Sequence, residues 1–251
     1  MVNDTAICLR AWDWSETSQT VALFSREHGL LRGVAKGSKR EKSKFSGGFE
    51  PPSRGIIAFS PKPTEGLTLL TSWDLIETYP AMRINLRAFH AGMAMIDLIY
   101  HAVVQNDPHP GLFDALSESL SSIREPALTE RSSLSLLFAT LDETGHRPEL
   151  SADVRTGEAL AAANAYGFSA RLGGLVADDV GVRVDREGGE IWRVRATTVD
   201  LLRQLGESRI IGSADSDTIK RATRLLALYY REVFRIEPLI LKHMSEDGGR
   251  A

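Results

Sequence analysis

The densest group of chemically active side chains in the sequence is a run of cations near residue 40. Six basic residues and one acidic residue, Glu41, fall between positions 32 and 44. The six are Arg32, Lys36, Lys39, Arg40, Lys42 and Lys44. Such side chains bind nucleic acid because each phosphate contact releases condensed counterions. The run predicts a DNA-binding loop, and a merely solvated charged loop is the alternative that the sequence leaves open.

Two aromatic residues follow these cations, Phe45 and Phe49, with Gly47 and Gly48 between them. Proteins that hold single strands combine a positive groove with aromatic rings on which bases stack. Glycine would let the backbone approach a ligand closely. We therefore expect Phe45 and Phe49 to be candidate base-stacking residues beside the cations.

A second basic stripe is predicted on the last helix. Its members are spaced four, seven and four residues apart: Lys220, Arg224, Arg231 and Arg235. At about 100° per residue they fall within about 60° of one another, so they share one face of a helix. The favoured interpretation is the ordinary exposed side of an amphipathic helix, and a second DNA contact is the alternative.

Signals of enzymatic chemistry are weak. The stretch from Gly33 to Arg40 lacks the glycine spacing and the Gly-Lys-Ser/Thr ending of a phosphate-binding loop, and there is no Gly-x-Ser-x-Gly nucleophile motif. The six histidines are scattered; His90 and His101, eleven residues apart on one predicted helix, are too far from each other to share a metal. The adjacent acids Asp178 and Asp179 are typical of a solvated turn. We predict no catalytic residue, no metal site and no cofactor.

Composition places the chain among ordinary globular proteins. It has 251 residues, of which 43% are hydrophobic and 25% charged, and a formal net charge of -3, so any polyanion must bind to a local basic patch. The single cysteine, Cys8, cannot form an internal disulfide, which suits a reducing cytoplasm. The N-terminus lacks the layout of a signal peptide. The apolar stretch over residues 89–104 is too short to span a bilayer and contains Asp97, so we expect no membrane association.

The elements that must position these residues begin with short strands. Five runs rich in apolar and β-branched residues are separated by glycine- and proline-containing turns, at residues 5–12, 20–24, 30–36, 54–60 and 67–76. Five short strands at close spacing predict a small β-barrel, of which the OB-fold is one example. The cationic run then joins the third strand to the fourth.

Helical periodicity dominates after residue 80. Apolar residues recur at three- and four-residue steps from Leu86 to Val103. Further helices are predicted over residues 111–123, 129–143 with Thr129 as N-cap, 158–166, 198–205 and 217–234 with Ser216 or Asp215 as cap. A β-hairpin is expected from residues 180–184 and 191–195, and residues 248–251 are expected to form a frayed tail. The predicted fold class is α+β.

Four short motifs stand out in the N-terminal third: Glu-Thr-Ser at 16–18, the Glu-His-Gly turn at 27–29, the Val-Ala-Lys-Gly-Ser-Lys-Arg block at 34–40 and Lys-Ser-Lys-Phe at 42–45. In this combination the N-terminal third resembles the RecO family of bacterial DNA-repair mediators. The end of the fifth predicted strand, Asp-Leu-Ile-Glu-Thr at 74–78, also resembles that family. A looser likeness continues through Gly-His-Arg-Pro-Glu-Leu at 145–150 and Gly-Gly-Leu at 173–175.

The resemblance implies a domain organisation. An OB-fold nucleic-acid-binding domain would cover residues 1–80, and a helical domain would cover residues 81–251 with an inserted zinc-finger-like segment at about 145–196. Many family members carry two Cys-x-x-Cys pairs in that segment. The corresponding positions here are Asp153, Thr156, Ala177 and Val180, so a small zinc-domain remnant without cysteines is expected.

The resemblance also implies a function without catalysis. Such a mediator binds single- and double-stranded DNA and anneals complementary strands. It works with RecR to load the RecA recombinase onto DNA coated by single-strand-binding protein, whose acidic C-terminal tail it recognises, and it acts in the RecF pathway, at the nucleoid in the cytoplasm. Arg131 is a guess for the rim of the tail pocket. The alternatives are a scaffold whose barrel binds an acidic protein partner and, third, a hydrolase or nuclease, which would require a cluster of metal-binding acids that the sequence does not show.

Overall fold

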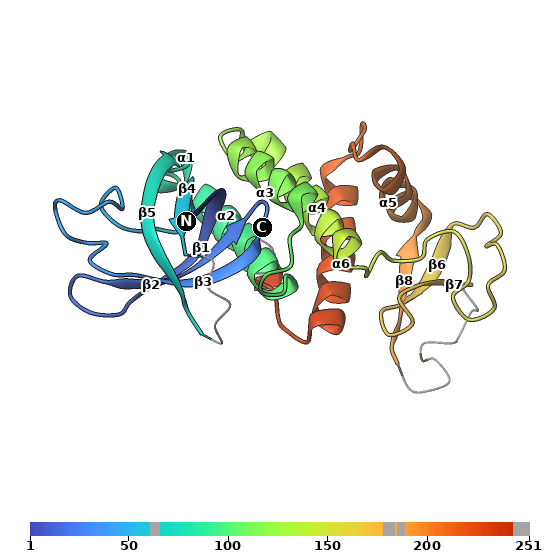
Figure 1. Cartoon of the computed structure of the whole chain (residues 1–251). Helices are drawn as coiled ribbons and strands as arrows, with labels where there is room; N and C mark the ends of the chain where they lie inside the picture. The colour runs from blue at the N-terminus through green and yellow to red at the C-terminus, as the bar shows by residue number, and fades with distance from the viewer. Residues whose placement is uncertain (61–65, 178–183, 185–188, 243–251) are drawn as a thin grey trace. The chain divides into compact units, whose positions relative to one another are not determined.

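The computed structural model describes residues 1–60, 66–177, 184 and 189–242, and the chain forms two compact units, Met1–Arg124 and Glu125–Ala251 (Figure 1). The first unit contains a closed β-barrel and three helices. The second contains helices and a small three-stranded sheet. The predicted α+β class is confirmed.

All five strands predicted in the N-terminal part are present. They are β1 Val2–Asp13, β2 Gln19–Ser25, β3 Gly29–Ala35, β4 Ser53–Phe59 and β5 Thr68–Glu77. They close into a barrel in the order β1-β2-β3-β5-β4, with β4 pairing back to β1. Neighbouring strands are antiparallel except β3 and β5, which are parallel over a short stretch. This five-stranded closed sheet is of the OB type.

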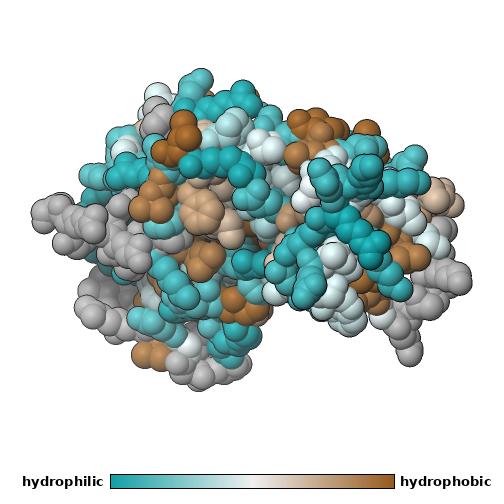
Figure 2. All heavy atoms as spheres, turned by 90° about the vertical axis from the view of Figure 1, so that its left-hand side faces the viewer, coloured by the Kyte–Doolittle hydropathy of each residue, from teal (hydrophilic) through white to brown (hydrophobic). Residues whose placement is uncertain are grey.

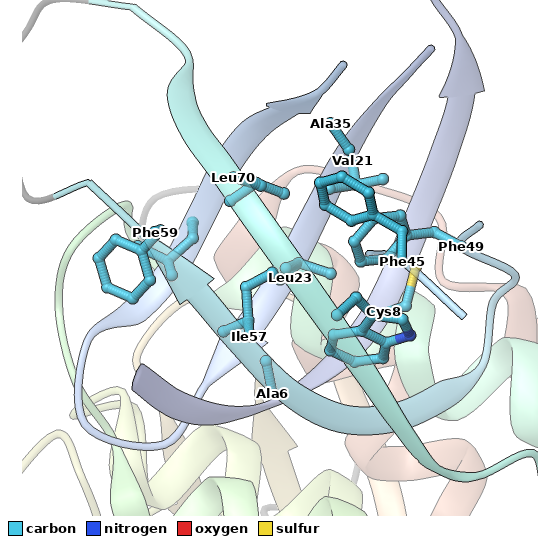
Figure 3. Packing of buried hydrophobic residues seen from close by; sticks show 12 residues of the cluster. Ala6, Cys8, Val21, Leu23, Ala35, Phe45, Phe49, Ile57, Phe59 and Leu70 are labelled. Atoms are coloured by element: carbon cyan, nitrogen blue, oxygen red, sulfur yellow. The ribbon is translucent and has the colours of Figure 1, made fainter. Parts of the chain in front are cut away.

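The barrel interior is filled by one side of each strand. Because successive residues of a strand point to opposite faces, alternate residues such as Leu31 and Ala35 of β3 are buried while Arg32 is exposed. Aromatic rings complete the interior, among them Phe45, Phe49 and Phe59 (Figure 3). Trp73 is fully buried against Phe49 at a ring-centroid distance of 5.0 Å. Gly55 leaves room for the Trp73 ring, because a Cβ there would lie 2.9 Å from its Cζ2 atom.

Three helices follow the barrel in the first unit: α1 Ala81–Ile84, α2 Leu86–Ala102 and α3 Pro110–Ser122. Asn85 caps α2, because its side chain accepts the backbone N–H of Ala88 at 3.1 Å. The α2 helix contacts β1, where the buried carboxylate of Asp97 pairs with Arg10 at 2.5 Å. The predicted helix from residue 86 is therefore confirmed, and the side of it that faces the barrel is buried.

The second unit is built from α4 Pro126–Glu143, β6 Ala165–Ser169, β7 Gly174–Val176, β8 Ile191–Arg195, α5 Ala196–Ser208 and α6 Ser216–Phe234. The sheet order is β7-β6-β8. Asp215 caps α6 by accepting the N–H of Thr218 at 2.8 Å, as predicted. Thr129 is not the cap of α4: the helix begins three residues earlier, and Glu125 occupies the cap position.

The alanine-rich stretch 158–166 is not a helix. The backbone N–H of Asp153 is bonded to Glu158 and that of Leu160 to Ser151, so the segment pairs with its neighbour and then enters β6. The predicted hairpin lies partly outside the described residues, although β8 is confirmed and Val184 bridges Glu190. Residues 248–251 also lie outside the described part.

The domain boundary near residue 80 stays a prediction. It coincides with the end of the barrel, whereas the compact unit continues to Arg124 and so includes α1, α2 and α3. Among the described helices, none has the length and hydropathy needed to cross a membrane.

Candidate nucleic-acid interface

The cations predicted to bind DNA lie on the connection between β3 and β4, here called the cationic loop (residues 36–50). Turns shape this loop, with the N–H of Arg40 bonded to Gly37 and that of Ser43 to Arg40. Its far end is tied to β5, since the N–H of Trp73 donates to the Lys44 carbonyl at 2.8 Å. The Ser46 hydroxyl donates to the Trp73 carbonyl at 2.9 Å. The second half of the loop is therefore fixed to the barrel.

The near end of the loop is bound to the turn between β1 and β2, here called the β1–β2 turn (residues 14–18). The N–H of Lys39 donates to the carbonyl of Thr17 at 3.0 Å, and that of Gly37 donates to the Ser18 hydroxyl at 3.0 Å. The Lys39 ammonium pairs with Asp13 at 2.5 Å. These contacts hold the cationic loop and the β1–β2 turn side by side.

Gln19 is the buried centre of this arrangement. Its side-chain oxygen accepts the Phe49 N–H at 3.0 Å and the Ser38 hydroxyl at 3.1 Å, and its amide nitrogen donates to the Phe49 carbonyl at 3.1 Å. Gly48 is required beside it: its φ is 108°, and a Cβ there would lie 2.8 Å from the Gln19 oxygen. One amide thus positions both halves of the loop.

The charged ends of the loop cations face solvent. The five loop cations, Lys36, Lys39, Arg40, Lys42 and Lys44, are all exposed. In the described part of the chain no carboxylate lies within 4.0 Å of any of these side chains except Lys39. Four uncompensated positive charges on one anchored loop give a local positive field on a chain whose net charge is -3.

Arg32 occupies a different environment from the loop cations. It projects from the middle of β3 on the outer wall of the barrel, where its guanidinium lies 5.9 Å from the centre of the Tyr100 ring of α2. Arg10, its neighbour two strands away, lies over the same ring at 5.3 Å. Arg32 therefore packs against the helix as well as facing solvent, and the structure does not place it on the loop.

The expectation that Phe45 and Phe49 stack on bases is corrected by the structure. Each ring is only 5% exposed, and both point into the barrel interior among the residues labelled in Figure 3. Their centroids are 5.9 Å apart. A ring enclosed by protein on both faces cannot receive a base, so these two residues close the end of the barrel core.

Sequence reasoning missed two exposed aromatic residues on the neighbouring segment. Trp12 ends the outer face of β1 and is 49% exposed, and Trp14, in the β1–β2 turn, is 64% exposed. Side chains as large as tryptophan are usually mostly buried. The signal available in the sequence was a Trp-Asp-Trp triplet between a strand and a polar turn. On the face shown in Figure 2, hydrophobic residues (brown) lie in small separate patches among hydrophilic residues (teal).

The second basic stripe lies on α6 and just beyond it, and much of its charge is neutralised. Lys220 lies 3.6 Å from Glu130, Arg231 lies 3.3 Å from Glu237 and Arg235 lies 2.6 Å from Glu232. Arg224 is exposed and has no carboxylate partner among the described residues. A phosphate would have to compete with these glutamates, so this stripe is the weaker candidate.

Arg131 is used inside the second unit. Its guanidinium donates to the carbonyls of Ile211, Gly212 and Ala214, at 3.2, 2.6 and 2.9 Å, and so fixes the connection between α5 and α6. A guanidinium with three carbonyl partners is occupied as a structural donor. The guess that it forms the rim of a peptide pocket has no support in this geometry.

The residues at the expected zinc positions do not fit a metal. Both oxygens of the buried Asp153 carboxylate are engaged: one accepts the Arg155 N–H at 2.8 Å, and the other accepts the Ala177 N–H at 2.8 Å and the Arg155 guanidinium at 2.9 Å. Thr156 and Ala177 offer no thiolate or imidazole. The described residues contain no group of three or more potential metal ligands, and Val180 lies outside them.

Comparison with known proteins gives matches over nearly the whole chain. The family model described as "Recombination protein O N terminal" matches residues 1–79, and the one described as "Recombination protein O C terminal" matches residues 83–239. The DNA repair protein RecO of Syntrophobacter fumaroxidans is 29% identical over 228 residues, which cover 91% of this chain and 85% of that protein. The protein of the same name from Geobacter metallireducens is 35% identical over 128 residues, covering 50% and 52% respectively. That from Rhodopirellula baltica is 32% identical over 143 residues, covering 57% and 53%.

Proposed function

This chain belongs to the RecO family of DNA repair and recombination proteins, and from that membership we propose that its barrel binds DNA through the cationic loop. As a member of this family it is a mediator of the RecF pathway and not an enzyme. A mediator of this kind acts through binding energy alone. The question for this chain is therefore which residues contact DNA.

The observation that carries the proposal is the pairing state of the loop cations. Lys36, Arg40, Lys42 and Lys44 are exposed and have no carboxylate partner among the described residues, while the α6 stripe is largely paired. Each such cation placed on a phosphate releases counterions, which favours binding at low salt. The anchored backbone of the loop lowers the entropy lost when these side chains meet DNA.

The same charges suit the annealing of complementary strands. Two phosphate backbones repel each other, and cations held between them offset this repulsion while bases pair. We assign both single-stranded and double-stranded DNA as ligands on this basis, because the phosphate backbone is common to both. Family membership favours RecR and the acidic tail of single-strand-binding protein as partners, at the bacterial nucleoid in the cytoplasm.

A matched pair of variants tests the proposal. The loop variant replaces Lys36, Arg40, Lys42 and Lys44 with alanine, and the helix variant replaces Lys220, Arg224, Arg231 and Arg235 with alanine. Both lose four positive charges, so they share the same net charge. We expect the loop variant to anneal complementary oligonucleotides at least about tenfold more slowly than the unmodified protein, because one lost phosphate contact alone weakens binding measurably.

The helix variant is expected to anneal at nearly the unmodified rate. Annealing is followed by fluorescence quenching between labelled strands, with single-strand-binding protein absent and then present. Equal rates for the loop variant and the unmodified protein would contradict the assignment of the DNA site. An equal loss in both variants would show that net charge, rather than the loop, governs annealing.

A further inference from the structure

The barrel carries a second surface beside the cationic loop, and it is aromatic. Trp12 and Trp14 flank Asp13 at the end of β1, and more than half of the Trp14 side chain is exposed. Ala11 packs against the barrel core, so the alternation of the strand turns Trp12 to the outer wall. The N–H of Trp14 donates to the Ser18 carbonyl at 2.9 Å, which holds its backbone in a closed turn.

Strand register places this aromatic surface next to cations. Trp12 is paired with Thr20 on β2, and Thr20 is paired with Val34 on β3. Neighbouring strands lie about 4.8 Å apart, so the backbones at Trp12 and Val34 are separated by about 10 Å. Lys36 directly follows Ala35, the last residue of β3, and is exposed, and the next residue, Gly37, is bonded to the Ser18 hydroxyl of the β1–β2 turn. A single strand of a few nucleotides could therefore contact both Lys36 and the Trp12 ring.

Direct contacts also link the aromatic surface, through Asp13 and the β1–β2 turn, to the cationic loop. Asp13, between the two tryptophans, pairs with Lys39 of the loop at 2.5 Å, and the Lys39 N–H is bonded to Thr17. The position of the tryptophans relative to the loop is thus set by hydrogen bonds and an ion pair. Proteins that bind single strands combine cations that contact the backbone with aromatic rings on which bases stack, and this surface carries both kinds of side chain.

We propose that Trp12 and Trp14 form a stacking platform for unpaired bases, while the cationic loop holds the adjoining phosphates. The inference rests on the proposed DNA-binding function and adds a ligand preference to it: single-stranded over double-stranded DNA. In a duplex the flat faces of the bases are already stacked on one another, whereas every unpaired base offers a face to an indole ring.

Charge complementarity favours a nucleic acid over an apolar protein segment as the occupant. The loop beside the tryptophans carries four exposed cations without carboxylate partners in the described part of the chain. These charges would remain uncompensated against an apolar peptide. A single strand supplies both the ring faces and the negative charges.

The test compares three ligands of equal length: an oligothymidylate, an abasic strand with the same phosphates, and a duplex. They are bound to the full chain and to two variants, one with Trp12→Leu and Trp14→Leu and one with Trp12→Phe and Trp14→Phe. The unmodified protein should bind thymidylate more tightly than the abasic strand. The leucine variant should lose roughly 5- to 150-fold in thymidylate affinity for each stacked base, and with it the preference over the abasic strand.

The other measurements separate stacking from charge. Abasic and duplex affinities, and the dependence of each on salt, should be unchanged in the leucine variant, and the phenylalanine variant should keep most of the preference for bases. Equal binding of thymidylate and abasic strand by the unmodified protein overturns the inference, as does a leucine variant that retains the preference. The latter result would leave the tryptophans to a protein partner. A loss of all three ligands together with a smaller salt slope overturns it too, since the tryptophans would then only shape the loop.

The proposed DNA-binding function fails separately. If the unmodified protein shows no salt-dependent binding to any of the three ligands, both proposals are wrong. If it binds all three ligands with a strong salt dependence and has no preference for bases, only the stacking platform is wrong.

Discussion

Gln19 is the residue on which the position of the cationic loop depends most. Its amide makes three hydrogen bonds, to Ser38 near one end of the loop and to both backbone groups of Phe49 at the other. The side chain is buried, so water cannot replace these partners. A buried polar group that loses its partner costs about 1–3 kcal/mol.

Replacing Gln19 with leucine should therefore destabilise the first unit by about 3 kcal/mol, because the Ser38 hydroxyl and two Phe49 backbone groups lose their partners. DNA affinity should fall because the loop is less ordered, while the slope of affinity against salt should stay the same because every cation remains. Denaturant unfolding and oligonucleotide titration measure the two effects. The neighbouring Thr20→Val is the control, and unfolding of Gln19→Leu at the unmodified midpoint would contradict this role.

At the residue scale, charge could be predicted from the sequence and burial could not. Lys42 and Lys44 had to be exposed, because an ammonium group without a partner is costly to bury. Phe45 was compatible with an exposed platform or with a core position. Which of the two holds depends on the path of the chain after β3 and on contacts with Trp73, which lies 28 positions further along the sequence.

At the scale of elements, Asp153 joins a turn to a strand end. The turn over residues 153–157 is closed by the Gly157 N–H on the Asp153 carbonyl at 2.7 Å, and the carboxylate reaches the Ala177 N–H just after β7. Arg155, through its hydrogen bonds and its charge, and the two backbone N–H donors hold the pKa of Asp153 at about 2, below its ordinary 3.8. A carboxylate with these partners connects the turn over residues 153–157 to the end of β7.

The stability that Asp153 contributes should depend on pH in a defined direction. Its folded pKa is depressed, so the contribution is complete above the ordinary value of 3.8 and disappears as pH falls toward about 2. Asp153→Asn should cost about 2 kcal/mol near neutral pH. Thermal unfolding of both proteins across this range should show the difference shrinking below pH about 4. A difference that is absent at neutral pH, or that grows in acid, would contradict the role.

Elements differ in how far their sequences determine them. The barrel strands could be predicted because alternation and turn residues agree with the final packing. Residues 158–166 could not, because alanine's high helix propensity is a local preference of less than about 1 kcal/mol per residue, and the hydrogen bonds between this segment and residues 151–153 override it. The start of α4 was misplaced because threonine is a residue type that often caps helices, whereas Thr129 lies within the first turn of α4.

At the scale of the whole molecule, an acidic chain must concentrate its positive charge to bind a polyanion. Basic residues number 30 and acidic residues 33, so the mean field of the protein opposes DNA. Local binding is compatible with this because exposed charges farther apart than about 10 Å are largely screened at moderate salt. The loop cations can thus act on a phosphate while carboxylates elsewhere remain too distant to matter.

The most direct test of this account is the slope of DNA affinity against salt concentration for the unmodified protein, the loop variant and the helix variant. Each phosphate contact on a single strand contributes about 0.7 to that slope, so removing the four unpaired loop cations should reduce its magnitude by about 3. The helix variant, with the same loss of charge, should keep the unmodified slope. An unchanged slope in the loop variant, or an equal reduction in the helix variant, would contradict the assignment of the cationic loop as the DNA contact.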